Sequence, residues 1–263
     1  MAAALMEETA LSPLSESHTP AGMPYAIRLE HLSRVFGSGE SRVEALRDVS
    51  IGIPAGSFTA VMGPSGSGKS TFLQCSAGLD QPSEGKIFLG DVEVTALREP
   101  KLTILRRERV GFVFQSFNLL PALSAWENIV LPIRMGGSRP DKHWVRWLVE
   151  RVGLQDRERH RPAELSGGQQ QRVAIARALV TKPAVVFADE PTGALDTRTG
   201  REILELLRDI VHDVGQTVVM VTHDPVAASY AQRVIFLADG RVVDALDAPT
   251  RDVVAARMTR LEP

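Results

Sequence analysis

The loop sequence Gly63-Pro64-Ser65-Gly66-Ser67-Gly68-Lys69-Ser70 is the most informative segment of this chain of 263 residues. It has the spacing G-x-x-x-x-G-K-[ST] of a loop that binds phosphate groups. Phosphate oxygens need several backbone N–H groups at close range, and glycine lets the backbone approach them with positive φ. The apolar run 57–62 before the loop reads as a buried strand, and 70–77 reads as a helix whose free N–H groups favour anions. The loop therefore predicts a nucleoside triphosphate site, in which Lys69 contacts the β- and γ-phosphates and Ser70 binds Mg²⁺.

Two adjacent acids end another apolar run, Val185-Val186-Phe187-Ala188-Asp189-Glu190. A buried strand with this ending delivers its carboxylates to the carboxyl edge of a parallel sheet, where open α/β folds bind their ligands. At that edge Asp189 can hold Mg²⁺ through its water shell, and Glu190 can polarise an attacking water molecule. Acids at a strand end are often only solvated, but a chain that also carries a phosphate-binding loop favours the catalytic interpretation.

The order of the expected strands indicates an α/β fold. Buried strands in the second half of the chain alternate with helices, which is typical of a mostly parallel sheet covered on both faces. The early hairpins predict an added antiparallel sheet. The expected strands and hairpins are 27–35, 43–53, 57–62, 86–94, 112–114, 183–188, 217–221 and 233–243.

Helical patterns fill much of the remaining chain. Residues 122–161 have helical spacing, with Trp144, Trp147 and Leu148 on one face, where core packing is the simplest explanation. Residues 250–261 read as a charged amphipathic helix.

Composition restricts the class of protein. Hydrophobic residues make up 44% and charged residues 24%, as in ordinary soluble domains, and the net charge of -2 predicts no nucleic-acid partner. Cys75 is the only cysteine, so no internal disulfide can form, and its apolar surroundings predict a buried thiol. Residues 1–24 lack the basic start and apolar run of a signal peptide, so we expect a disordered tail. No apolar run reaches about 18 residues, so any membrane role would act through another chain.

A further motif, Leu165-Ser166-Gly167-Gly168-Gln169, resembles the signature of ATP-binding cassette (ABC) ATPases, and Gln170-Gln171-Arg172 continues the resemblance. A serine hydroxyl and glycine N–H groups at the start of a helix, here expected over 169–180, can form a second phosphate site. The resemblance covers residues 27–245. It implies a P-loop NTPase (RecA-like) core in a domain spanning 25–263, with an N-terminal antiparallel β subdomain and an α-helical subdomain inserted at 118–163.

The remaining family motifs are also present. Phe36 stands where the family places an aromatic side chain that stacks on adenine, although it could also be an ordinary core or loop phenylalanine. Gln115 resembles the glutamine that lies near Mg²⁺ and the attacking water. Asp196, in Ala194-Leu195-Asp196, resembles the loop that communicates across the pair of subunits. His223, in Thr222-His223-Asp224, resembles the histidine that reaches the γ-phosphate.

The resemblance implies a complete nucleotide site made by two chains. ATP would bind with adenine on Phe36 and its phosphates over 63–71, which ends at Thr71. Mg²⁺ would be held by Ser70, Gln115 and Asp189. A second copy of the chain, or a related ATPase, would contribute 166–169 to form a head-to-tail dimer, in which Glu190, His223, Gln115 and Lys69 are the expected catalytic residues.

The resemblance also predicts a membrane partner. The helical region at 115–161 would dock a separate membrane permease, which places the protein on the cytoplasmic face of the membrane. The segments 114–121 and 189–196 are most similar to the subfamily of lipoprotein-releasing, macrolide-exporting and cell-division ATPases, although Ala194 replaces its frequent Asn. An exporter or release machine is therefore expected.

Two alternatives within the family, and one outside it, give different functions. A cell-division-type ATPase that signals through a membrane protein without moving cargo stays open. A DNA-repair or translation ATPase would usually carry a second cassette or a long insertion, and this chain has neither. An unrelated P-loop kinase would have no use for 165–169. The sequence does not name the cargo or the permease.

Overall fold

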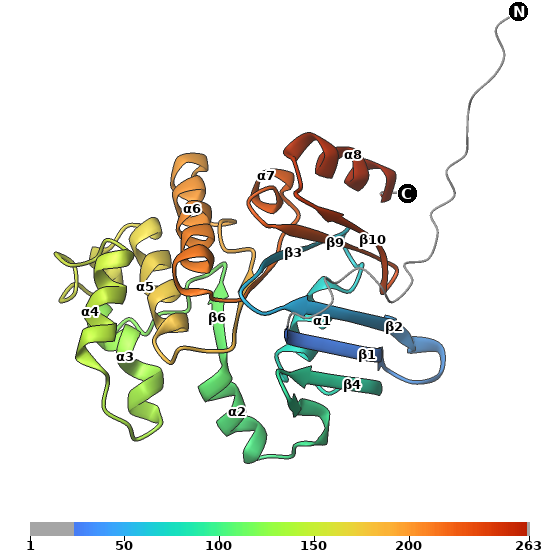
Figure 1. Cartoon of the computed structure of the whole chain (residues 1–263), viewed down its shortest axis with the longest axis horizontal. Helices are drawn as coiled ribbons and strands as arrows, with labels where there is room; N and C mark the ends of the chain where they lie inside the picture. The colour runs from blue at the N-terminus through green and yellow to red at the C-terminus, as the bar shows by residue number, and fades with distance from the viewer. Residues whose placement is uncertain (1–23, 262–263) are drawn as a thin grey trace, which may run out of the picture.

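The computed structural model describes residues 24–261 of the chain and contains two β-sheets (Figure 1). The expected tail, apart from Pro24, lies outside the described residues. The first sheet is antiparallel, in the order β2-β1-β4-β5, and confirms the sheet predicted from the early hairpins. Its strands are β1 (Tyr25–Phe36), β2 (Val43–Pro54), β4 (Glu84–Leu89) and β5 (Val92–Glu93).

The second sheet has six strands in the order β10-β9-β3-β8-β7-β6. All neighbouring strands are parallel except the hairpin pair β9 and β10, so the prediction of a mostly parallel sheet is confirmed. The strands are β3 (Phe58–Met62), β6 (Val110–Phe114), β7 (Val185–Asp189), β8 (Val218–Val221), β9 (Arg233–Ala238) and β10 (Arg241–Asp247).

The parallel strands are buried on both faces, which explains why they read as continuous apolar runs. Because side chains alternate along a strand, Phe187 faces one core while Val186 and Ala188 face the other. The first core lies between the two sheets and is filled by α1 (Lys69–Ser76), through Phe72, Leu73 and Cys75. The helix that follows the phosphate-binding loop is therefore clamped between two sheets.

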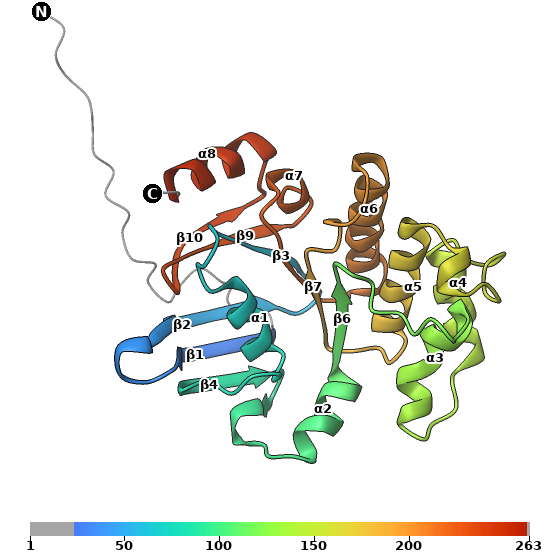
Figure 2. The ribbon, with the colours of Figure 1, turned by 180° about the vertical axis from the view of Figure 1, so that it is seen from behind.

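The second core lies between the opposite face of the parallel sheet and six helices. Figures 1 and 2 show these helices, α3 to α8, on the side of the parallel sheet away from the antiparallel sheet. Helices α3 and α4 pack on α5 and share this core with the sheet. The helices on this face are α3 (Ala125–Met135), α4 (Lys142–Arg151), α5 (Gly167–Leu179), α6 (Thr197–Val214), α7 (Pro225–Ala228) and α8 (Arg251–Leu261).

Local sequence explains where these helices begin. Ser124 and Glu127 form a capping box at α3, and Asp141 accepts hydrogen bonds from the N–H groups of His143 and Trp144 at α4. Gly215, at φ 64, follows the last residue of α6 in the left-handed conformation that favours glycine.

Most expected elements are confirmed within a few residues, but the expected helical region 122–161 ends with α4 at Arg151. Three helices were not delimited from the sequence, namely α2 (Lys101–Arg109), the long α6 and the short α7. Trp144 and Trp147 are only partly buried, with their rings stacked 5.0 Å apart against the core, whereas Leu148 is completely buried. Cys75 is buried as predicted, and burial raises the pKa of its thiol to about 12. Between residues 24 and 261, no helix combines the length and apolar character needed to span a bilayer.

Candidate functional site

Strand register brings most of the predicted site residues to one edge of the parallel sheet. Phe114 of β6 is opposite Asp189 of β7, and Asp189 is opposite Val221 of β8. Val61 of β3 is also opposite Val221. The residues that follow these strands are therefore neighbours at the carboxyl edge, where open α/β sheets bind ligands. They include Gln115, Glu190, His223 and the loop 63–68.

The loop 63–68 depends on glycine at two close approaches. A Cβ atom on Gly63 would lie 2.0 Å from the carbonyl oxygen of Leu237, and one on Gly68 would lie 2.3 Å from that of Ala45. Gly68 also has a φ of 100°, which other residues rarely adopt. The rest of the loop, Pro64, Ser65, Gly66 and Ser67, leads into α1, whose first turn carries Ser70 and Thr71.

The side chain of Lys69 folds back onto the phosphate-binding loop and hydrogen-bonds to its backbone. Its Nζ donates to the carbonyl oxygens of Gly63 at 2.8 Å and Pro64 at 2.7 Å, and an ammonium group has a third N–H. Burial lowers the pKa of Lys69, while the charges of Glu190 and Asp189 oppose that shift. The ammonium group thus lies between the loop and the two acids at the end of β7, Asp189 and Glu190.

Asp189 and Glu190 lie in different surroundings, although they are adjacent. Burial and then the charge of Glu190 raise the pKa of Asp189, and the charge of Lys69 opposes the shift. Glu190 has a φ of 47°, a strained value for a residue with a side chain, and such strain concentrates at functional sites. Its backbone N–H donates to the carbonyl of Val221, which fixes the turn.

Glu190 and His223 form a direct pair, with Oε1 and Nδ1 separated by 2.6 Å. In the tautomer with the proton on Nδ1, the imidazole donates this hydrogen bond to the carboxylate. Nε2 of the exposed imidazole is then the atom that can face a substrate. A pair of this kind orients both groups without covering them.

Gln115 lies against the loop that follows β7. A Cβ atom on Gly193 would lie 2.7 Å from Nε2 of Gln115, so the amide packs directly against this glycine. The amide oxygen of Gln115, the hydroxyl of Ser70 and the carboxylate of Asp189 are the hard oxygen donors that Mg²⁺ takes in proteins. Among residues 24–261, no cluster of three or more His, Cys, Asp and Glu side chains forms a metal site.

The residues at 166–169 form a well-capped helix start. The Ser166 hydroxyl accepts from the N–H of Gln169 at 3.3 Å, and the Gln169 side chain accepts from the N–H of Ser166 at 2.9 Å. A Cβ on Gly168 would lie 2.4 Å from Cγ2 of Thr199, and Gly167 faces Leu195. The start of α5 therefore packs closely against the start of α6.

Asp196 caps α6, because its Oδ1 accepts from the N–H groups of Arg198 and Thr199. Hydrogen bonds, the largest effect coming from Thr199, hold the pKa of its carboxyl below the usual range. The cap fixes where the loop 190–196 ends.

The phosphate-binding loop and the start of α5 belong to different parts of the same chain. The loop follows β3, whereas α5 packs on β6, and β8 and β7 lie between these strands. Three strand spacings separate β3 from β6 by about 14 Å. Within one chain, residues 166–169 thus lie apart from Lys69. The resemblance implied the same separation, because it assigned 166–169 to the site of a second copy.

Phe36 lies at the end of β1, opposite Val43, and is 39% exposed. Two residues after Val43, the carbonyl of Ala45 contacts the loop at Gly68. The exposure of the ring excludes the interpretation of Phe36 as a core residue. Its neighbouring strand β2 contacts the phosphate-binding loop through Ala45.

Two side chains of α5 with no role assigned from the sequence contact the loops of the site. Gln171 is completely buried, and its Nε2 donates to the carbonyls of Pro191 at 2.6 Å and Phe114 at 3.4 Å. Arg177 donates to the carbonyls of Phe117 and Asn118, and burial lowers its pKa. The signals in the sequence were a polar residue on the buried side of a helical pattern and, for Gln171, its place just after the motif at 165–169.

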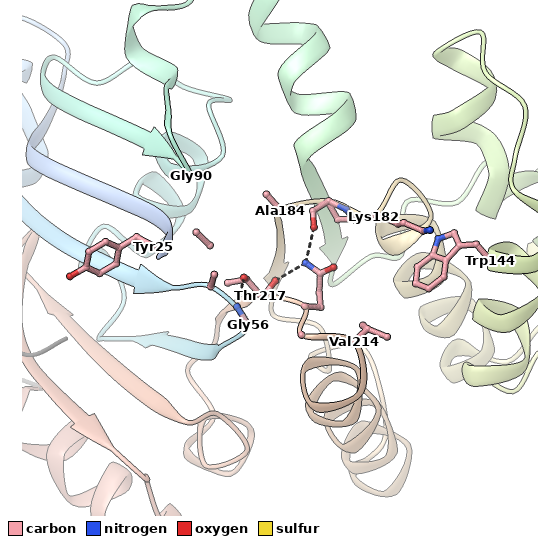
Figure 3. Close-up of a pocket in the computed structure, with 13 residues that line it drawn as sticks. Tyr25, Gly56, Gly90, Trp144, Lys182, Ala184, Val214 and Thr217 are labelled. Carbon is pink, nitrogen blue, oxygen red and sulfur yellow. Dashed lines mark hydrogen bonds between the residues drawn. The ribbon is translucent and has the colours of Figure 1, made fainter. Parts of the chain in front are cut away.

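A cavity of about 540 Å³ lies at the opposite ends of the parallel strands (Figure 3). Gly56, Ala184 and Thr217, which line it, come just before β3, β7 and β8. The amide of Gln216, which lines the cavity, donates to the carbonyls of Pro183 and Thr217. This cavity is remote from the carboxyl edge and has no part in the candidate site.

Fold and site together define a P-loop ATPase. Its phosphate-binding loop at 63–68, the two acids at the end of β7 and the start of α5 at 166–169 all lie along one edge of the parallel sheet. The sequence profile of the ABC transporter family matches residues 46–193, and the chain belongs to this family.

Among its relatives is the uncharacterized ABC transporter ATP-binding protein MJ0796 of Methanocaldococcus jannaschii, which is 44% identical over 82% of this chain and 94% of the relative. The macrolide export ATP-binding/permease protein MacB of Neisseria gonorrhoeae is 46% identical over 82% of this chain, which spans only 34% of MacB.

Solved structures agree with the fold. The dimeric structure of MJ0796 in a post-hydrolysis state, bound to ADP and Pi, has a TM-score of 0.76 and 40% identity, and the alignment covers 85% of this chain and 99% of that one. The structure of cbiO1 from Clostridium perfringens, part of the transporter complex cbiONQ, has a TM-score of 0.77 and 29% identity, with 90% and 93% covered. The predicted family and fold are thereby confirmed.

Proposed function

We propose that this chain binds and hydrolyses ATP as one half of a dimer and powers a separate membrane permease of the exporter type. The observation that carries the proposal is the convergence of Lys69, Gln115, Asp189, Glu190 and His223 at the carboxyl edge of one sheet. The ADP- and Pi-bound dimer of MJ0796 supports the hydrolysis, and the similarity to MacB supports export.

Positioning and charge stabilisation dominate phosphoryl transfer, and each residue has one task in the proposal. Lys69 and the loop N–H groups hold the phosphates. Glu190 accepts a hydrogen bond from the attacking water and aligns it, while His223 contacts the γ-phosphate through Nε2. Mg²⁺, when bound by Ser70, Gln115 and Asp189, neutralises charge on the β- and γ-phosphates. Phe36 stacks on the adenine.

The site is completed by a second copy in this proposal. Ser166 and the N–H groups at the start of α5 would meet the γ-phosphate bound to the partner copy, because a helix start favours anions. The separation of α5 from the phosphate loop within one chain, and the dimeric structures of MJ0796, support this arrangement.

The permease would dock on a groove beside Gln115. A cavity of about 490 Å³ is lined by Leu79, Thr103, Phe114, Asn118 and other residues of α2, β6 and α5. Leu79 is 48% exposed there, and exposed apolar surface of this kind suits a helix of a partner protein. Such a contact would bring the protein to the cytoplasmic face of the membrane.

The proposal is tested with the purified chain and with cells. We expect Mg²⁺-dependent release of phosphate from ATP, and no release from the Lys69→Ala variant. A photo-crosslinker at Asn118 should capture a membrane protein with several spanning segments, whereas one at the exposed Glu205 should not. Absence of ATP hydrolysis would refute the enzymatic part, and capture at neither site would refute the docking groove. Hydrolysis and capture without cargo movement would favour the cell-division type of function.

A further inference from the structure

Arg34 and Asp80 form a two-pronged ion pair near the proposed base site. Nε and Nη2 of Arg34 each donate to one carboxylate oxygen of Asp80, both at 2.8 Å. Both side chains are about three-quarters buried, with exposures of 23% and 24%. A paired, planar geometry of this kind fixes the guanidinium more firmly than a single contact would.

The same guanidinium lies over the ring of Phe36. Cζ of Arg34 is 4.4 Å from the ring centroid, within the range of a cation–π contact. Arg34 and Phe36 are two residues apart on β1, so their side chains project from the same face of the strand. The guanidinium covers one face of the ring, and Phe36 remains 39% exposed.

Asp80 is itself held by the helix that starts at the phosphate loop. The N–H groups of Leu79 and Asp80 both donate to the carbonyl of Gln74, in the last turn of α1. The chain of contacts therefore runs from the phosphate loop along α1 to Asp80, then to Arg34, and finally to the ring of Phe36.

We propose that Arg34, held by Asp80, is a positioning residue for the nucleotide base. It fixes the plane of Phe36 at a set distance from the phosphate loop and polarises the ring from behind. The inference rests on the proposed stacking of adenine on Phe36 and extends it to two residues that do not touch the nucleotide. Its contribution depends on the base and not on the phosphates.

The test separates the base from the phosphates. We expect Arg34→Met, which keeps the aliphatic stem, to weaken ATP binding by about two- to fivefold, the range of a partly exposed cation–π contact. Binding of inorganic tripolyphosphate should change by less than that. Asp80→Asn should have the same effect in weaker form. Calorimetric titration of both ligands gives the two affinities.

The chain offers a matched control on the same strand. Cζ of Arg28 lies 4.1 Å from the ring centroid of Phe88, in a similar arginine–phenylalanine pair away from Phe36. Arg28→Met should leave both affinities unchanged. In a Phe36→Ala background, Arg34→Met should have no further effect on ATP, because the two side chains act as one unit.

Each outcome has a separate meaning. Equal weakening of ATP and tripolyphosphate by Arg34→Met, or no weakening of either, overturns the positioning role. Persistence of the effect in the Phe36→Ala background also overturns it. If Phe36→Ala itself binds ATP as tightly as the unaltered chain, then the proposed stacking fails before Arg34 is at issue.

Discussion

Glu190 differs from its neighbour Asp189 in what its side chain can reach. Its Oε1 is 2.6 Å from Nδ1 of His223, and its strained φ turns it away from the buried strand. We expect Glu190→Gln to lower turnover by about 10²–10⁴-fold, as for loss of a general base, while ATP still binds. Phosphate release and calorimetric titration measure the two effects.

The control for this prediction is a carboxylate of the same type outside the site. Glu205 is exposed on α6, and Glu205→Gln should leave turnover unchanged. Turnover of Glu190→Gln within threefold of the unaltered chain would remove Glu190 from the catalytic residues.

Asp189 gives a prediction of pH dependence. Its pKa is raised above the ordinary value of 3.8, chiefly by burial and by Glu190, so its ionised form is disfavoured in the folded protein. The resulting loss of stability is absent below pH 3.8 and grows as the pH rises through the raised pKa. We expect Asp189→Asn to unfold about 1–2 °C higher than the unaltered chain at pH 8.

This difference should shrink as the pH falls toward 4, because the carboxyl of the unaltered chain takes up a proton as the pH falls through its raised pKa. Thermal unfolding of the two proteins without nucleotide, followed by circular dichroism at several pH values, measures it. A gap that widens on acidification would contradict the sign of the shift. The same variant should lose Mg²⁺-dependent hydrolysis.

At the residue scale, sequence predicted the groups that stand in continuous motifs. Lys69 and Ser70 could be assigned because backbone, charge and hydroxyl requirements all fall within eight residues. Arg34 could not, since its partner Asp80 is 46 positions away and no spacing rule joins them. Gln171 had a motif but no evident role until Pro191 and Phe114 were found beside it.

At the scale of elements, α5 is joined to the segment that follows β6. Arg177 donates to the carbonyls of Phe117 and Asn118, whose φ angles of 59° and 50° are unusual for non-glycine residues. Arg177→Met would leave two carbonyls without this partner. We expect a loss of about 1–3 kcal/mol in unfolding free energy and slower hydrolysis, because Gln115 precedes this segment.

Urea unfolding and phosphate release measure the two effects of Arg177→Met. Arg198→Met is the control, since this side chain is 90% exposed and pairs only at the surface with Glu202. A stable variant with full activity would show that the segment after β6 holds its conformation without α5.

Elements with a strong repeating pattern were predictable, and weakly patterned ones were not. The strand β3 is buried along its whole length, so its apolar run was clear. In α2, by contrast, Leu102 is the one buried residue, and four arginine and lysine positions obscure the helical spacing. The pairing order of the strands also required the structure, because strands adjacent in the sheet, such as β3 and β8, are far apart in sequence.

At the scale of the whole molecule, the order of strands in the parallel sheet keeps two parts of the proposed nucleotide site apart within one chain. The phosphate loop after β3 and the start of α5 beside β6 open along the same edge, with β8 and β7 between them. Two copies related by a twofold axis can place each loop opposite the other copy's helix start, so that one rotation completes both sites. In the proposed function, this geometry would couple hydrolysis to dimerisation.

Mixing two inactive variants tests this coupling. Lys69→Ala removes the phosphate-binding ammonium, and Ser166→Arg fills the start of α5, so each protein alone should be inactive. In a mixed dimer, the intact loop of one chain meets the intact helix start of the other, and we expect part of the activity to return. A chain carrying both substitutions, mixed with Lys69→Ala, should restore nothing. If the first mixture is as inactive as its components at dimer-forming concentrations, then Lys69 and Ser166 do not meet across the two copies.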